Sequence, residues 1–184
     1  MSTPRFLAAV EFVLQHETEY ARGKRGYENA IAEHDPDDPG GTTKFGIDQR
    51  SHPEVNIEQL TVDRARQIYE QSYWGPSHAA ELPAGVGEIC FDTAVNCGVG
   101  KAAIWLQEIL AQVGLYHGAI DARIGPQTLL AARSANIPQL CGELLNRRVQ
   151  FYHRLASSPR YQKFLQGWLN RCDDLVAFVN LKKL

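Results

Sequence analysis

Apolar residues recur at helical spacing along almost the whole chain, with one long interruption between residues 35 and 60. In the first segment Phe6, Val10, Val13 and Leu14 are spaced three and four residues apart, which predicts the buried face of a helix. We expect helices at 4–20, 61–73, 83–97, 101–113, from 126 onward, 137–156 and 160–181. The fold class is therefore predicted to be mainly α, with at most a small β-hairpin in the interrupted stretch and a C-terminal helical lobe.

The first apolar run leads to Glu17, and a polar segment that ends in a Gly- and Thr-rich turn at 35–47 follows it. Glycoside hydrolysis needs one carboxylic acid that stays protonated near neutral pH, and a second group that stabilises the sugar, attacks it or activates a water. Partial burial at a helix end, next to apolar residues, favours a protonated carboxyl. In the turn, proline fixes φ and Gly-Gly permits positive φ. The pair of elements therefore indicates a glycosidase.

Two motifs in this stretch resemble those of bacterial and phage N-acetylmuramidases of glycoside hydrolase family 108, which have a lysozyme-like fold. Glu17 and Tyr20 match the family's Glu-Gly-Gly-Tyr motif, with Thr18 and Glu19 in place of the two glycines. After about a dozen extra residues, 38–47 match its Asp-Pro-Gly-Gly-x-Thr-x-x-Gly-Ile turn. The resemblance implies cleavage of the β-1,4 bond between N-acetylmuramic acid and N-acetylglucosamine in peptidoglycan, with no cofactor and no metal.

The resemblance also assigns roles to individual residues. Glu17 falls on the family's catalytic acid and would protonate the leaving oxygen. Asp38 would hold or replace the attacking water, and Thr43 would position that water, as a short hydroxyl does in related lysozymes. Tyr20 and Asp35 are predicted substrate contacts. Asp38 has an alternative role as a turn former, and that alternative stays open.

Further substrate contacts are predicted from the middle of the chain. Tyr73 and Trp74 are aromatic rings of the kind that stack on sugars, although an aromatic pair at a helix end also suits a core. Glu88, Asp92 and Asn96 are spaced four residues apart and therefore share one helix face. The run that starts at Asn96 resembles the Asn-x-Gly-x-Gly element that borders the glycan cleft in several lysozyme and lytic transglycosylase families. We predict that Asp92 and Asn96 line the groove; the alternative for Asn96 is a bond to backbone where two helices meet.

The C-terminal half carries a second resemblance. Residues 118–129 are similar to the Asp-Gly-x-x-Gly-Pro-x-Thr segment of peptidoglycan-binding helical modules. We therefore predict a lysozyme-like catalytic region over 1–98 and a peptidoglycan-binding-like helical region over 99–184, packed together as one compact unit. Whether the second region binds glycan separately is left open.

Composition limits the partners. The formal net charge is −2, and nothing in it favours nucleic acid, which usually needs a concentrated basic patch. No signal peptide and no uncharged run of about 20 residues is recognised. We therefore expect a monomer made in the bacterial cytoplasm that acts on peptidoglycan strands in the periplasm or cell wall, after release through a holin or a secretion apparatus.

The four cysteines show no zinc spacing and suit buried free thiols. Two alternative functions remain at this point. A lytic transglycosylase would act on the same substrate with an internal sugar hydroxyl in place of water. A non-catalytic wall-binding or phage protein would explain the replacement of the two motif glycines by Thr18 and Glu19.

Overall fold

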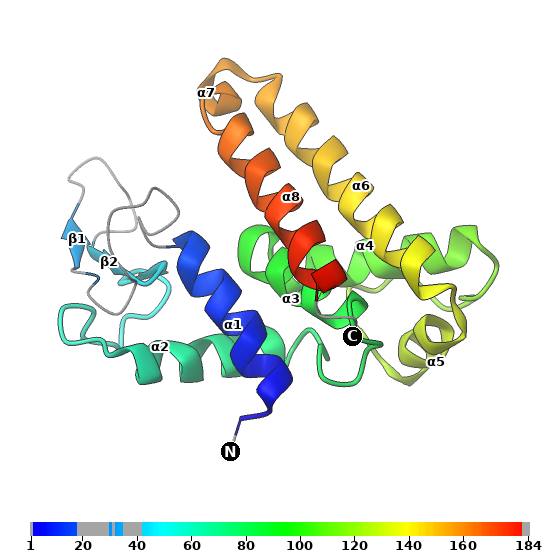
Figure 1. Ribbon diagram of the computed structural model, residues 1–184, viewed down its shortest axis with the longest axis horizontal. Helices are drawn as coiled ribbons and strands as arrows, with labels where there is room; N and C mark the ends of the chain where they lie inside the picture. The colour runs from blue at the N-terminus through cyan, green and yellow to red at the C-terminus, as the bar shows by residue number, and fades with distance from the viewer. Residues whose placement is uncertain (1, 18–29, 31, 35–41, 182–184) are drawn as a thin grey trace. The chain divides into compact units, whose positions relative to one another are not determined.

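The computed structural model describes residues 2–17, 30, 32–34 and 42–181. Its backbone contacts divide the chain into two units, Met1–Ser72 and Tyr73–Leu184, here called unit 1 and unit 2. Helices make up most of the described chain, so the predicted mainly α fold is confirmed (Figure 1). Among the described helices, none has the length and apolar character needed to span a membrane.

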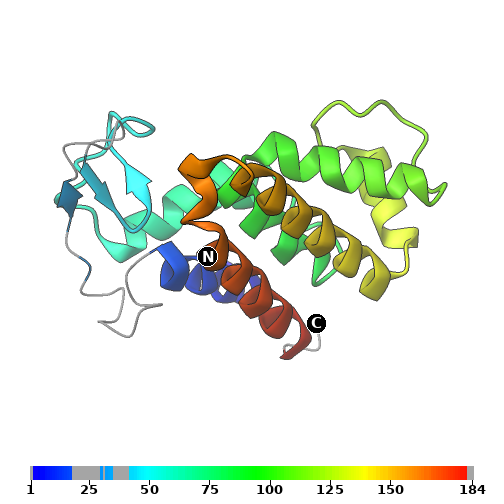
Figure 2. The ribbon, with the colours of Figure 1, turned by 90° about the horizontal axis from the view of Figure 1, so that it is seen from above.

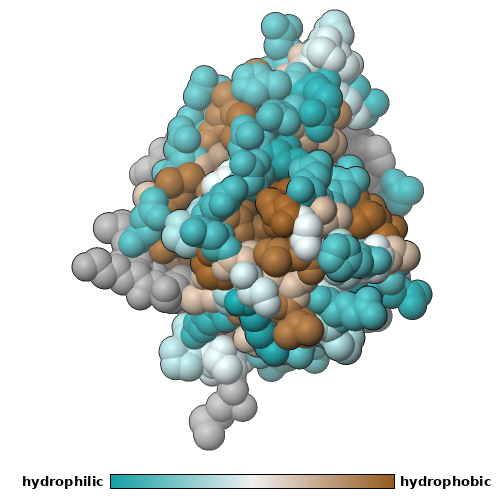
Figure 3. Space-filling model, turned by 90° about the vertical axis from the view of Figure 1, so that its right-hand side faces the viewer, coloured by the Kyte–Doolittle hydropathy of each residue, from teal (hydrophilic) through white to brown (hydrophobic). Residues whose placement is uncertain are grey.

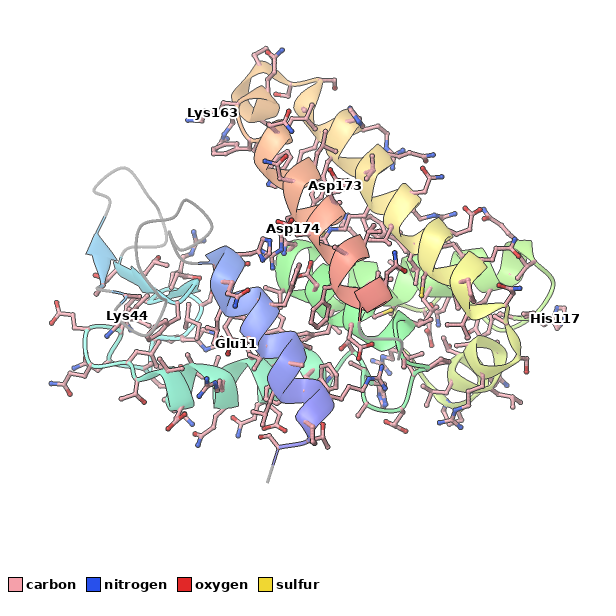
Figure 4. The ribbon with its side chains drawn as sticks, in the orientation of Figure 1. Glu11, Lys44, His117, Lys163, Asp173 and Asp174 are labelled. Carbon is pink, nitrogen blue, oxygen red and sulfur yellow. The ribbon has the colours of Figure 1, made fainter. Side chains whose placement is uncertain are left out.

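Unit 1 begins with the helix α1, Pro4–Glu17. Thr3 caps it, because the Thr3 hydroxyl accepts a hydrogen bond from the Phe6 backbone N–H at 3.2 Å, and proline suits the first helical position. The predicted apolar stripe of α1 is buried. Glu11 on the outer side of α1 lies 3.6 Å from Arg66 of the helix α2 (Val62–Tyr69), so these two helices lie side by side (Figure 4).

A three-stranded antiparallel sheet completes unit 1, in the order β1 (Glu33–His34), β2 (Thr42–Lys44) and β3 (Ile47–Asp48) (Figure 2). The β2–β3 hairpin lies in the interval where the sequence predicts one. The strand β1 lies outside that interval, because a two-residue strand has no apolar alternation that a sequence pattern can reveal.

The helix α2, Val62–Tyr69, starts where the sequence predicts it, since the Thr61 hydroxyl accepts a hydrogen bond from the Arg64 backbone N–H at 3.3 Å. Ala65, Ile68 and Tyr69 form its buried face. A five-residue π-helical segment, η3 (Glu70–Trp74), follows directly in the chain. Sequence periodicity does not distinguish such a segment from the end of an α-helix.

Unit 2 contains the remaining helices: α3 (Val86–Cys97), α4 (Val99–Gln112), α5 (Pro126–Ser134), α6 (Ile137–Ala156), α7 (Pro159–Gln162) and α8 (Leu165–Leu181). The helix α3 is the centre of the unit, because its residues 86–94 are all buried and it packs against α4 and α6. The helices α6 and α8 are long and antiparallel, with α7 at the corner between them (Figure 1).

Candidate active site

Glu17 is the last residue of α1 and is half-buried. The turn that precedes it is held by His16, whose Nδ1 donates a hydrogen bond to the Phe12 carbonyl at 2.9 Å. The His16 ring also lies over the Phe12 ring, with 4.3 Å between the two centroids. Phe12 belongs to the buried core. The end of α1 is therefore anchored, and it presents the carboxyl group of Glu17 at a defined place.

The tip of the β2–β3 hairpin is a two-residue turn formed by Phe45 and Gly46. Both residues have positive φ, 55° and 73°, as in the type I′ turns that suit the twist of a hairpin. Positive φ is strained for a bulky residue such as phenylalanine. The Phe45 side chain is buried, and its carbonyl accepts a hydrogen bond from the buried Tyr69 hydroxyl at 2.8 Å. These contacts hold the strained tip in place.

This tip touches the Glu17 side chain. A Cβ atom added to Gly46 would lie 2.7 Å from Cβ, 2.9 Å from Cγ and 2.9 Å from Oε2 of Glu17. Distances below about 3 Å between non-bonded heavy atoms of this kind are repulsive. Glycine at position 46 is therefore required twice, by the positive φ and by the close approach of backbone to a carboxyl group.

Thr43 lies in β2, and Asp48 lies directly opposite it in β3. The two residues form a non-hydrogen-bonded pair, because the neighbouring backbone bond runs from the Gln49 N–H to the Thr42 carbonyl. Their side chains are therefore on the same face of the sheet. Burial raises the pKa of Asp48, but hydrogen bonds from the Ser51 backbone and side chain outweigh it and hold that pKa below its ordinary value. An ionised carboxylate thus lies beside the Thr43 side chain.

Asp92 has a different environment. Its carboxylate is 1% exposed and lies in unit 2 between two arginines of α6 and α8. Arg148 donates from Nη1 at 2.5 Å, and Arg171 donates from Nη2 at 2.7 Å. Burial raises the pKa of Asp92, but the charges of Arg171 and Arg148 and their hydrogen bonds outweigh burial and lower the pKa to about 2. The geometry favours a role for Asp92 in holding α3, α6 and α8 together, while sugar contact by Asp92 stays a prediction.

The other predicted substrate contacts in unit 2 differ in exposure. Trp74 is buried, and its ring meets the Phe91 ring edge-on with 5.2 Å between centroids, as in a core pair. Tyr73 is half-buried. Asn96 is half-buried as well, and its side chain donates to the Asp92 carbonyl at 3.3 Å. Sugar contact by these three residues stays a prediction.

The remaining predicted site residues, Tyr20, Asp35 and Asp38, lie outside the described residues. The structure instead adds residues to which the sequence analysis assigned no role: the strained Phe45, the close contact at Gly46, the supporting Tyr69 and the carboxylate of Asp48. The sequence signal for the turn was present, as a Phe-Gly pair between two short extended runs. Tyr69 carried no such signal, because its partner is 24 residues away.

One apolar groove of unit 2 offers little to an anionic glycan. A groove between the end of α4 and the start of α6 is lined mainly by apolar residues, including Ile109, Val113, Leu115 and Leu140. This is the side of unit 2 that carries α5, and Figure 3 shows brown apolar residues exposed there among hydrophilic ones. The charged residue in the groove lining is Glu143, whose sign is unfavourable for an anion. Among the described residues, no group of three or more His, Cys, Asp or Glu is placed to hold a metal ion.

Comparison with known proteins matches the two halves of the sequence to two different families. Residues 10–98 match the family described as Glycosyl hydrolase 108, and residues 101–173 match the family described as Predicted Peptidoglycan domain. No curated protein matches the chain. The solved "Structure of Brucella abortus SagA" shares 26% sequence identity over 95% of this chain and 95% of that one, with a TM-score of 0.73.

The family resemblance inferred from the motifs around Glu17 is thus confirmed, and the second matched region accords with a peptidoglycan substrate. The predicted division into regions 1–98 and 99–184 concerns function and stays a prediction. Residues 10–98 thus form a region of the glycosyl hydrolase 108 family, and with the peptidoglycan domain that follows, the chain is a peptidoglycan hydrolase.

Proposed function

We propose that the protein is an N-acetylmuramidase, which hydrolyses the β-1,4 bond between N-acetylmuramic acid and N-acetylglucosamine with Glu17 as the general acid. The observation that carries the proposal is the contact between Glu17 and the hairpin tip, where Gly46 leaves room for a carboxyl group and no more. A general acid must be held within hydrogen-bonding reach of the leaving oxygen, and a fixed helix end facing a fixed turn achieves this.

In the proposed reaction, the protonated Glu17 gives its proton to the glycosidic oxygen as the bond to the sugar breaks. A water molecule then completes the hydrolysis on the opposite face of the ring. The Asp35–Thr43 turn holds that water, with Asp38 as its base and the Thr43 hydroxyl as a further contact. An inverting site leaves room for a water between carboxyl groups about 6.5–9.5 Å apart, whereas a retaining site keeps them about 5–5.5 Å apart. We propose inversion.

The first test replaces the acid without changing its shape. Glu17→Gln should slow the lysis of purified peptidoglycan by about 10²–10⁴-fold, because the amide cannot donate the proton. The matched control is Glu11→Gln on the outer side of the same helix, which should lyse at the wild-type rate. Turbidity of sacculi reports both rates. Wild-type lysis by the Glu17→Gln variant would exclude Glu17 as the acid.

The second test identifies the reaction from its products. Mass spectrometry of the released fragments should show the added water of hydrolysis, whereas a lytic transglycosylase yields an anhydro-sugar that lacks it. NMR of freshly formed products should show the α-anomer at the new reducing end. A first-formed β-anomer would show retention and would overturn the proposed inverting water.

A further inference from the structure

Basic residues are concentrated at one end of unit 2, although the whole chain has a net charge of −2. Residues 147–171 contain six Arg and Lys residues and no Asp or Glu. This segment covers the second half of α6, all of α7 and the start of α8. Figure 4 shows Lys163 at the α7 end, while Asp173 and Asp174 lie farther along α8.

Three of these six basic side chains have acidic partners within unit 2. Arg148 and Arg171 bind Asp92, and Arg147 forms an ion pair with Glu108. The other three are exposed and form no ion pair among the described residues. They are Arg154, Arg160 and Lys163. Their charge is therefore available to a ligand in solution.

A row of aromatic rings leads from the core of unit 2 to the same end. The buried Tyr152 ring stacks on the half-buried Trp168 ring, with centroids 5.0 Å apart and planes 20° apart. Trp168 in turn lies 5.8 Å from the Phe164 ring, which is 46% exposed. Lys163 places its ammonium group 4.9 Å from the Phe164 centroid. The row thus begins in a rigid core and ends at the surface beside a cation.

An exposed ring and exposed cations at the same place can bind a ligand that neither would bind alone. A single exposed phenylalanine is ordinary, and an exposed lysine is more so. An exposed ring backed by a stacked pair is held in one orientation, so a sugar face can pack on it with little loss of conformational entropy. The ammonium group of Lys163 beside the ring adds attraction for carboxylates.

We propose that Arg154, Arg160, Lys163, Phe164 and Trp168, here called the basic–aromatic corner, form a glycan-binding site for peptidoglycan. The proposal rests on the proposed function for its substrate class, and it assigns the binding to a surface built by unit 2 alone. The rings contact the faces of N-acetylated sugars, and the cations contact the carboxylates of the strand and its peptides. Charge complementarity favours this anionic polymer over a neutral polysaccharide.

The test measures binding without cutting. In the Glu17→Gln background, co-sedimentation with purified sacculi compares the parent with a triple variant, Arg160→Glu, Lys163→Glu and Phe164→Ala. We expect the apparent Kd to rise roughly ten-fold, because two charge contacts and one aromatic contact are lost. Binding by the parent should weaken from about 50 mM to about 300 mM NaCl, as screening predicts.

A matched control comes from α5, which belongs to the same unit. Leu130→Ala with Arg133→Glu removes one exposed apolar side chain and reverses one exposed charge outside the corner, and it should leave binding unchanged. Far-UV circular dichroism checks that each variant is folded. If the triple variant is not folded, Phe164→Ala alone replaces it in the binding experiment, because Phe164 is the most exposed ring of the row.

Three results would overturn the proposal that the basic–aromatic corner binds peptidoglycan. The first is equal sedimentation of parent and corner variants. The second is an equal loss of binding in the α5 control. The third is corner-dependent binding to single-stranded DNA or to anionic phospholipid vesicles while sacculus binding is unchanged. Failure of the proposed function is distinguished separately, because it would leave sacculi uncut by the wild-type protein whatever the binding result.

Discussion

Two carboxylates of this protein, Glu17 and Asp92, lie in opposite environments. Glu17 ends a helix, is half-buried, and is approached by a backbone turn at Gly46. Asp92 lies inside a helix of unit 2, is almost fully buried, and is bound by two arginines. Asp92 is thereby kept ionised, since its pKa is held at about 2. A residue in that state cannot give up a proton at neutral pH, so this environment excludes the role proposed for Glu17.

The difference between these two environments indicates whether each side chain contributes to the stability of the fold or to the reaction. Two buried arginines without a counter-charge are costly, and Nη2 of Arg148 already lacks a hydrogen-bond partner among the described residues. Asp92 is therefore expected to affect folding. The surroundings of Glu17 restrict its position, so changes there are expected to affect the reaction and leave folding largely unaltered. The following variants test this separation.

The largest expected effect is on stability. Asp92→Asn keeps the shape of the side chain but leaves Arg148 and Arg171 buried without a counter-charge, so the free energy of unfolding should fall by roughly 3–5 kcal/mol. Urea denaturation followed by circular dichroism measures it. The control is Asp173→Asn, an exposed acid of α8, which should change the free energy by less than about 0.5 kcal/mol. Equal urea midpoints for wild type and Asp92→Asn would contradict the assigned role.

The next effect is on activity. Gly46→Ala places a Cβ atom against the Glu17 side chain, and a displacement of about 1 Å can cost about 10²-fold in rate. The control is Gly114→Ala, since Gly114 has the same φ of 73° but no atom within 4 Å of an added Cβ. Both variants carry the strain of positive φ, and lysis of sacculi well below the unfolding temperature compares them. Should the two variants lyse at the same rate, the contact with Glu17 has no catalytic importance.

Much of the fold was predictable because its signals are local. Thr61 caps a helix, and Gly125 with Pro126 starts another, as expected from sequence. The strand β1 and the π-helical segment η3 were not predictable, since two residues show no period and a π-turn has no distinct pattern. The basic–aromatic corner was missed for a different reason. A net charge of −2 averages over the chain and hides the absence of acids between 147 and 171.

The candidate site was predictable only in part. The motif match led to the prediction of Glu17 as the acid, which stays a proposal. The contact between Glu17 and Gly46 could not be predicted, because it joins residues that are far apart in sequence. Asp92 was expected to line a groove from its spacing with Asn96. That spacing defines a helix face and says nothing of what packs on it, and Arg148 and Arg171 are 56 and 79 residues away. Tertiary partners of this kind are invisible to periodicity.

A smaller effect on the free energy of unfolding is expected at low pH. The folded-state pKa of Asp92 is lowered from 3.8 to about 2, so its stabilisation is present above pH 4 or so and is lost as the pH falls towards 2. The shift corresponds to about 2 kcal/mol. The difference in unfolding free energy between wild type and Asp92→Asn should therefore narrow by that amount between neutral pH and about pH 2. A constant difference over this range would mean that Asp92 does not titrate as proposed.

The smallest effect concerns the bond that supports the hairpin tip. Tyr69→Phe removes the hydroxyl that donates to the Phe45 carbonyl and should cost about 1 kcal/mol in the free energy of unfolding. Because that carbonyl belongs to the strained residue next to Gly46, we also expect the rate of lysis to fall a few-fold. The matched variant is Tyr116→Phe in unit 2, whose hydroxyl donates to the Ala119 carbonyl at the same distance of 2.8 Å. The Tyr116→Phe variant should lose about as much unfolding free energy as Tyr69→Phe, and it should lyse sacculi at the wild-type rate. If both variants lyse at the wild-type rate, the Tyr69 bond supports folding alone, and the tip is held against Glu17 by the burial of Phe45.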